Sequence, residues 1–217
     1  LLRPGTSLGG ARPKATVKDD DGNLAVAKFP SRKDDYDVAL WEHFCHVMGR
    51  KAGINVADTH VVSGGQYNIL LSKRFDRTGA GRRKHFASAL TLLGLNDGDN
   101  ASTGCGYTDI VDFICDVKNN LEELYRRVAF NIIVGNSDDH FRNHGFILTQ
   151  KGWELSPAYD INPTLYEEQS LLINRETNKS DLDILLKSAG EYMLSADVAA
   201  RIIAEVKTSM KTWRGEA

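Results

Sequence analysis

The sequence predicts an α+β protein with two lobes. Short strand-like runs separated by turn residues fill the first third of the chain, whereas longer helical patterns dominate the remainder. Its 41% hydrophobic residues and net charge of -2 are ordinary for a globular protein, and no repeat or low-complexity linker interrupts the 217 residues. We therefore expect a β-rich lobe over residues 1–75 and a helical lobe over residues 76–217.

The first lobe is predicted to run loop, β-β, α, β-β. After a glycine-rich loop over residues 3–14, "ATVK" and "LAVAKF" are strand-like runs around the turn residues "DDDGN", and two more strands surround "SGGQ". A helix is expected over residues 34–52, with Gly53 as its C-terminal cap. The apolar residues of this helix recur on one face at positions Val38, Trp41, Phe44, Cys45 and Met48.

The second lobe is predicted to be helical with one hairpin. The hairpin pairs "GFILT" with "WELSP" around "QKG". Ser195 is a good N-cap for the last helix. The predicted helices cover residues 87–94, 108–115, 121–134, 181–189 and 195–213.

Composition excludes several classes of protein. The small net charge gives no reason to expect nucleic-acid binding, and no apolar run approaches the roughly 18 residues of a membrane span. Cys45, Cys105 and Cys115 are an odd number without CxxC spacing, which indicates reduced thiols, no zinc site and a cytoplasmic protein. Because the chain opens without Met on a loop-like stretch, we expect a piece of a longer protein.

The stretch "GNSDDHFRNHGFI" places a dense polar cluster directly after the apolar run "VAFNIIV". Asp138 could orient or deprotonate a hydroxyl, and Asn143 could ligate a divalent metal. Asp160, in "LSPAYDINP" beyond the following hairpin, could hold the same metal. A capped loop with solvated charges is the alternative. The order of Asp base, Asn and metal-binding Asp is typical of phosphoryl transfer.

The first lobe can supply the other parts of such a site. Lys28 stands alone near the end of an apolar strand, where a kinase fold holds the lysine that contacts ATP phosphates. Glu42 lies within the apolar pattern of the following helix, and Lys28 is its natural partner. A strand-edge lysine and a solvent-facing glutamate are the alternatives. In "KRFDR", from Lys73 past Phe75, the main chain between the lobes would bind an adenine.

The loop "GTSLGGARPK" matches neither GxxxxGK[ST] nor GxGxxG. Gly9 and Gly10 nevertheless allow the backbone to approach a phosphate closely, and Arg12 and Lys14 add positive charge. Ser7 is a hydroxyl beside these glycines, for which a turn-stabilising role is the simpler interpretation.

Taken together, these segments resemble the HipA family of bacterial serine/threonine kinases, the toxins of toxin–antitoxin systems. The resemblance covers nearly the whole chain in order, through "TSLGGARPKA", "AVAKFP", "EHFCHVMGRKAGINVAD", "SKRFDR", "GNSDDHFRNHGFI" and "LSPAYDINP". It implies a two-lobed, kinase-like fold that holds ATP and Mg²⁺ between the lobes.

The resemblance also implies roles for individual residues. Asp138 would be the catalytic base, Asn143 and Asp160 would bind Mg²⁺, and Lys28 would contact the phosphates. His140 matches the histidine of the family motif and Lys14 the loop lysine. Ser7 matches the serine that such kinases autophosphorylate.

The resemblance leaves three functions open. The first is a protein kinase acting on a cytosolic protein, for which an aminoacyl-tRNA synthetase is the best guess. The second is a small-molecule kinase on the same scaffold. The third is a catalytically silent module that binds an antitoxin of the helix-turn-helix type, or a chain that supplies the amino-terminal subdomain missing from this sequence.

Overall fold

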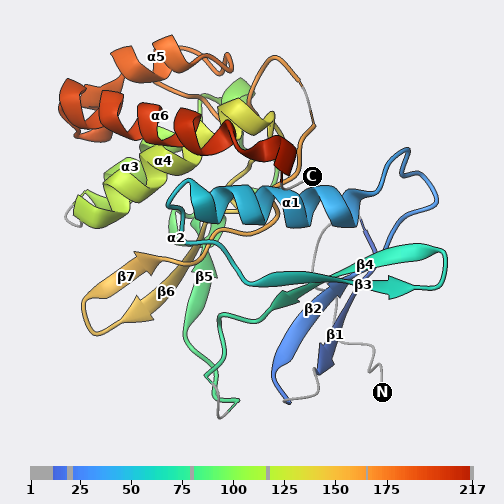
Figure 1. Ribbon diagram of the computed structural model, residues 1–217. Coiled ribbons are helices and arrows are strands. Elements are labelled where there is room, and N and C mark those ends of the chain that lie inside the picture. Colours follow the sequence, from blue (N-terminus) through green and yellow to red (C-terminus); the bar gives the residue numbers. More distant parts are fainter. Residues whose placement is uncertain (1–11, 19–21, 79–80, 116–117, 165, 216–217) are drawn as a thin grey trace.

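Strands that follow one another in the first lobe pair antiparallel, and four of them form one sheet (Figure 1). The computed structural model describes residues 12–18, 22–78, 81–115, 118–164 and 166–215. The strand order is β1-β2-β4-β3, so the two predicted hairpins meet along β2 and β4. These strands are β1 (Lys14–Lys18), β2 (Leu24–Lys28), β3 (Thr59–Gly64) and β4 (Tyr67–Lys73).

Helix α1 (Val38–Lys51) begins later than predicted. The expected start at Asp34 is wrong, because its carboxylate binds the Arg12 guanidinium at 3.0 Å and cannot cap a helix. Asp37 caps α1 instead by accepting a hydrogen bond from a first-turn amide. The predicted end is confirmed, since Gly53 takes a φ of +80° immediately after the last turn.

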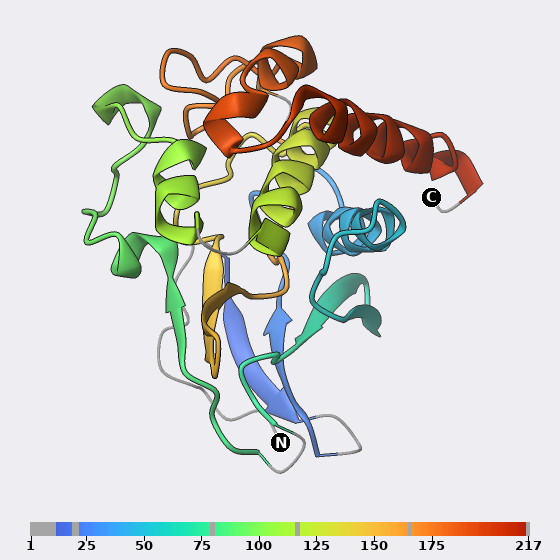
Figure 2. The same ribbon diagram turned by 90° about the vertical axis from the view of Figure 1, so that its left-hand side faces the viewer.

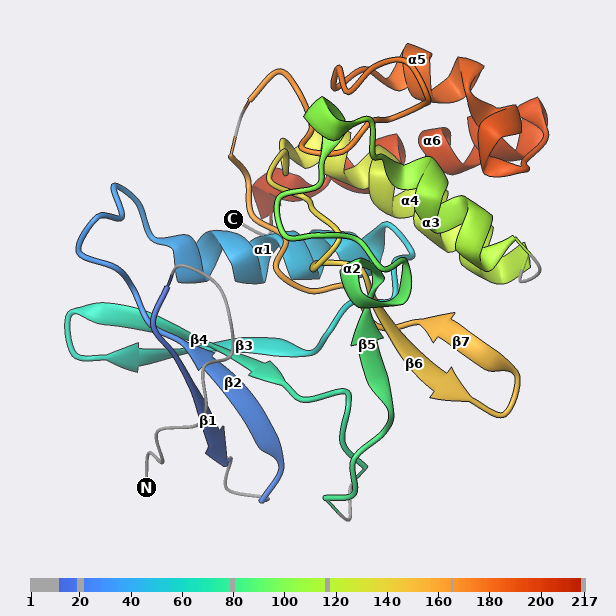
Figure 3. The same ribbon diagram turned by 180° about the vertical axis from the view of Figure 1, so that it is seen from behind.

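A second sheet of three antiparallel strands has the order β5-β6-β7 (Figure 3). The predicted hairpin of β6 (Gly145–Thr149) and β7 (Gly152–Leu155) is confirmed. The helix expected over 87–94 is wrong in its first part, because β5 (Phe86–Ser88) pairs with β6. Ser88 then caps the short helix α2 (Ala89–Leu92).

The remaining helices pack on one another above the two sheets (Figure 2). Each lies within a few residues of its predicted range, and α4 contacts α3, α5 and α6. Short 3-10 turns cover Ala101–Thr103, Ala189–Tyr192 and Trp213–Gly215. The helices are α3 (Tyr107–Ile114), α4 (Lys118–Val134), α5 (Leu182–Lys187) and α6 (Ala196–Met210).

Helix α1 joins the two lobes, because it lies between the four-stranded sheet and helices α4 and α6 (Figure 1). Its residues Cys45 and Met48 belong to the same buried cluster as Leu124 of α4 and Ile202 of α6. The predicted apolar face is buried only in part, since Trp41 is 41% exposed. No helix of the described chain is long and apolar enough to traverse a bilayer.

Gly145, the first residue of β6, gives a test of the packing between β5 and β6. A Cβ atom at this position would lie 2.3 Å from the Phe86 ring and 2.7 Å from Ser156 Oγ. We expect Gly145→Ala to lower the free energy of unfolding by about 1–3 kcal/mol through overpacking, measured by urea denaturation. The matched control is Gly190→Ala, whose added Cβ would meet nothing within 4 Å. Equal stability of both variants would contradict this packing.

Candidate active site

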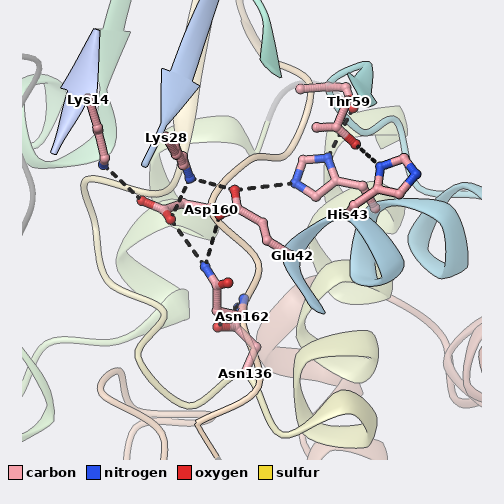
Figure 4. A network of polar contacts seen from close by, with 10 residues as sticks. Lys14, Lys28, Glu42, His43, Thr59, Asn136, Asp160 and Asn162 are labelled. Carbon is pink, nitrogen blue, oxygen red and sulfur yellow. Dashed lines mark hydrogen bonds and ion pairs between the residues drawn. The ribbon is translucent and has the colours of Figure 1, made fainter. Parts of the chain in front are cut away.

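Lys28 lies at the centre of the polar network between the lobes (Figure 4). Its Nζ atom is 2.5 Å from Glu42 Oε1 and 2.8 Å from Asp160 Oδ1. The predicted pairing of Lys28 with Glu42 is therefore confirmed. The side chains of Lys28 and Glu42 are 14% and 4% exposed, so the ion pair is shielded from water and Glu42 depends on Lys28 to compensate its charge.

The charges at this centre stabilise one another. Burial alone would raise the pKa of Asp160, but the ammonium groups of Lys28 and Lys14 lower it to about 2. Lys14 contributes from β1, with its Nζ atom 3.7 Å from Asp160 Oδ2. Burial raises the pKa of Glu42 against the opposing effect of Lys28. Burial lowers the pKa of Lys28, yet its two carboxylate partners outweigh this and raise it. Near neutral pH Asp160 is thus ionised and Lys28 is charged.

The backbone of Asp160 adopts an uncommon conformation. Its φ of +59° lies in the left-handed region, which costs a non-glycine residue roughly 1–3 kcal/mol. The preceding Tyr159 holds the segment in place: its hydroxyl donates to the Arg142 carbonyl at 2.6 Å, and its ring packs against those of Phe75 and Phe86. These contacts direct the Asp160 carboxylate toward Lys28.

Three asparagines connect Asp160 to the loop after α4, and sequence analysis did not identify them. Asn162 Nδ2 donates to Asp160 Oδ1 at 3.3 Å and to Glu42 Oε2 at 3.5 Å. Its main-chain amide donates to Asn136 Oδ1 at 3.3 Å, and Asn136 Nδ2 donates to Asn131 Oδ1 at 3.0 Å. The one signal in the sequence that could have identified part of this series is Asn131, a polar residue inside the apolar run "VAFNIIV".

This series of amides ends at Asp139, whose carboxylate is buried in the loop that follows α4. Asp139 Oδ2 accepts hydrogen bonds from Tyr107 Oη at 2.8 Å, Asn131 Nδ2 at 2.7 Å and His144 Nε2 at 2.8 Å. Burial would raise the pKa of Asp139, but His144 and the hydrogen bonds lower it. Asp139 thus ties the loop to α3 and α4, whereas its neighbour Asp138 is exposed.

The predicted catalytic residues lie on one tight turn of this loop. The Asn143 amide donates to the His140 carbonyl at 2.8 Å, and Asn143 Nδ2 approaches the Asp138 carbonyl at 3.5 Å. His140 lies near enough to Asp160 to contribute to the low pKa of that carboxylate, after burial and the two lysines. Because Asp138 is exposed, its side chain is free to meet an incoming hydroxyl.

The other predicted contacts to a nucleotide stay predictions. Ser7, Gly9 and Gly10 lie outside the described residues. Lys28 pairs with Leu70 and Lys73 pairs with Ala25 in the sheet. Since side chains alternate along a strand, the Lys73 side chain lies on the opposite face from Lys28. For a nucleotide beside Lys28, the main chain around Lys73 and Phe75 therefore stays the predicted contact to the adenine.

The described residues fit a magnesium ion better than a transition metal. No cluster of three His, Cys, Asp or Glu side chains that could hold a metal occurs among them. Asp160 supplies one ionised carboxylate, and the adjacent Asn162 Oδ1 is buried without a hydrogen-bond partner. One or two protein oxygens completed by water and phosphate is the usual environment of Mg²⁺.

The fold is protein-kinase-like, and the sequence comparisons agree. The family model "HipA-like C-terminal domain" matches residues 6–213, so this chain belongs to that family. It is 23% identical over 195 residues to the serine/threonine-protein kinase toxin HipA of Shewanella oneidensis, covering 76% of this chain and 45% of the toxin. It is 27% identical over 181 residues to a putative kinase of Haemophilus influenzae, covering 72% and 52%. The chain thus spans about half the length of these curated relatives.

Solved structures show the same fold. The HipA chain in a Shewanella oneidensis complex of HipA, HipB and operator DNA matches with a TM-score of 0.79 at 17% identity, covering 99% of this chain and 59% of that one. The Helicobacter pylori proinflammatory kinase CtkA matches with a TM-score of 0.59 at 14% identity, covering 94% and 90%. The predicted two-lobed, HipA-like α+β fold is confirmed.

The Asp139 cluster should contribute strongly to stability. Asp139→Ala leaves three donors without their acceptor, and we expect a loss of about 3–5 kcal/mol in the free energy of unfolding. Tyr107→Phe removes one donor and keeps the ring, so about 1 kcal/mol should be lost. Urea denaturation of both variants measures the difference. Equal losses would show that Asp139 does not organise the cluster.

His46 predicts how stability depends on pH. Its Nδ1 atom contacts the Ala57 carbonyl at 3.0 Å, and Nε2 is buried without a hydrogen-bond partner, 4.0 Å from Glu42 Oε1. Burial lowers the pKa of His46 from 6.5 to about 4. Between these values only the unfolded chain takes up the proton, so stability falls as the pH drops from 6.5 to about 4, by roughly 3 kcal/mol.

Urea denaturation between pH 7 and pH 5, where few carboxylates titrate, measures this slope. The variant His46→Gln should show a smaller slope because it removes the titrating group. An unchanged slope in His46→Gln would assign the pH dependence to other groups.

Proposed function

We propose that this chain transfers the γ-phosphoryl group of ATP to a serine or threonine hydroxyl of a protein. The observation that supports this best is the position of Lys28, which contacts both Glu42 of α1 and Asp160. A lysine held by a helix glutamate next to a metal-binding aspartate is the arrangement that protein kinases require for transfer.

Each residue of the proposed site has a physical task. Lys28 and Lys14 would attract the nucleotide phosphates, and Glu42 would hold Lys28 in its extended position. Asp160 and Asn143 would hold Mg²⁺, which on binding neutralises charge on the transferring phosphate. Asp138 would accept the proton of the acceptor hydroxyl, a role that suits an exposed carboxylate on a rigid turn.

The comparisons also support a proposal for a partner of this chain. The matching solved structure contains HipB and operator DNA beside HipA, so we propose a HipB-type protein as a partner of this chain. We also propose autophosphorylation of Ser7 as the means of switching the loop. A catalytically silent binding module is the alternative function, and the nucleotide experiment below separates the two.

Nucleotide binding gives the first test. Mg-ATP at about 100 times its dissociation constant should stabilise the wild type by about 2.7 kcal/mol, which raises the melting temperature by roughly 5–10 °C over Mg²⁺ alone. Asp160→Asn should lose most of this shift, since it removes the ionised metal ligand. The exposed Asp197→Asn is the matched control and should keep it. No shift in the wild type would favour the binding module.

Transfer gives the second test. Asp138→Asn should keep the Mg-ATP shift and lose about 10²–10⁴-fold in phosphoryl transfer to a generic protein acceptor, because only the proton acceptor is removed. Incorporation of labelled phosphate measures transfer, and mass spectrometry of the wild type reports phosphate on Ser7. Full turnover in Asp138→Asn would contradict the assigned role.

A further inference from the structure

A cavity of about 420 Å³ lies where the end of α1, the segment 54–58 and the chain after β4 meet. Five cations line it: Arg50, Lys73, Arg74, Arg77 and Lys84. We call this cavity the basic pocket. The Lys73 side chain is on the face of the sheet opposite Lys28, so the basic pocket and the proposed nucleotide site meet at the main chain around Lys73 and Phe75 from opposite sides. Pro157, three residues before Asp160, also lines it, so both lobes contribute to its wall.

Acidic side chains do not balance the charge of the basic pocket. Asp58 pairs with Arg50 at 2.9 Å, and Asp76 pairs with both Arg74 and Arg77 at 2.5 Å. Within the described chain, no side-chain ion pair or hydrogen bond is found for Lys73 or Lys84. Two carboxylates therefore face five cations in a protein whose net charge is -2.

The sequence concentrates this charge. Residues 73–84, "KRFDRTGAGRRK", contain six Lys or Arg and one Asp. The main chain brings the two ends of this segment together, since the Lys84 amide donates to the Asp76 carbonyl at 2.9 Å. Like charges held close in this way repel one another, and an anion between them relieves the repulsion.

The shape and chemistry of the basic pocket indicate the kind of anion. The ammonium groups of Lys73 and Lys84 are open to the oxygens of a phosphate dianion, and the paired arginines add positive potential around them. Its floor is apolar, because Ile54 and Val56 are buried beneath it and Phe75 and Pro157 form part of the wall. A polynucleotide backbone would leave this floor unused, whereas a peptide can place an apolar side chain beside its phosphate.

We propose that the basic pocket binds a phosphorylated serine or threonine within a segment of a protein partner. This goes beyond the proposed kinase activity and does not depend on it, because the lysine side chains that would hold the phosphate have no part in the proposed transfer. If the kinase activity also holds, the pocket would retain a partner that already carries phosphate.

The test measures binding to the intact chain without nucleotide. The probe is a fluorescent degenerate peptide library with a fixed central phosphoserine, and fluorescence anisotropy measures its binding. We expect the wild type to bind the phosphorylated library. Its affinity for the unphosphorylated library should be about tenfold lower or weaker still, because charge-assisted hydrogen bonds are lost. Lys73→Glu combined with Lys84→Glu should abolish binding, and the control pair Lys151→Glu and Lys187→Glu, also exposed, should keep it.

Each result decides the proposal. Retained affinity in the Lys73 and Lys84 double variant would overturn it, as would no binding by the wild type. Equal competition by inorganic phosphate alone would reduce the basic pocket to a free-ion site. Preferential binding of a short single-stranded RNA would replace the protein partner with a nucleic acid. If charge reversal prevents folding, seen by circular dichroism, Lys84→Gln carries the test. Binding retained by Asp160→Asn separates this result from failure of the proposed kinase.

Discussion

The contact of one lysine with two carboxylates determines how the two lobes of this protein meet. Lys28 comes from the sheet, Glu42 from α1 and Asp160 from the segment that follows the second sheet. Removing Lys28 leaves the buried Glu42 carboxylate without its ion-pair partner, which typically costs about 3–5 kcal/mol. The sheet, the connecting helix and the helical lobe are therefore held in one arrangement by electrostatics as well as by apolar packing.

The polar residues after α4 extend this centre into the helical lobe. Asn162, Asn136 and Asn131 pass hydrogen bonds from Asp160 to Asp139, and Asp139 fixes the turn that carries Asp138 and Asn143. The side-chain amides of Asn136 and Asn131 suit this task because each donates and accepts at once without adding charge. The polar residues that follow the apolar end of α4 thus bury one acid, Asp139, and leave its neighbour Asp138 exposed.

Local patterns were enough to predict the hairpins, the main helices and the pairing of Lys28 with Glu42. They could not decide which of two adjacent acids is buried, since Asp139 is enclosed by Tyr107, which is distant in sequence. They also missed β5, because three residues become a strand only when β6 lies beside them. The start of α1 was misplaced because Asp34 binds Arg12 of the preceding loop. In each case a contact between distant segments overrode a local preference.

The shared core constrains how the proposed site could be controlled. Met48 and Cys45 of α1 are buried against the helical lobe on the helix that carries Glu42. Moving α1 far enough to separate Glu42 from Lys28 would expose such side chains, at roughly 1.5–3 kcal/mol for each large one. The paired state of Lys28 is therefore the resting state of the fold, and α1 is poorly suited to act as a switch. Control of the proposed activity would therefore act on parts of the chain outside this core.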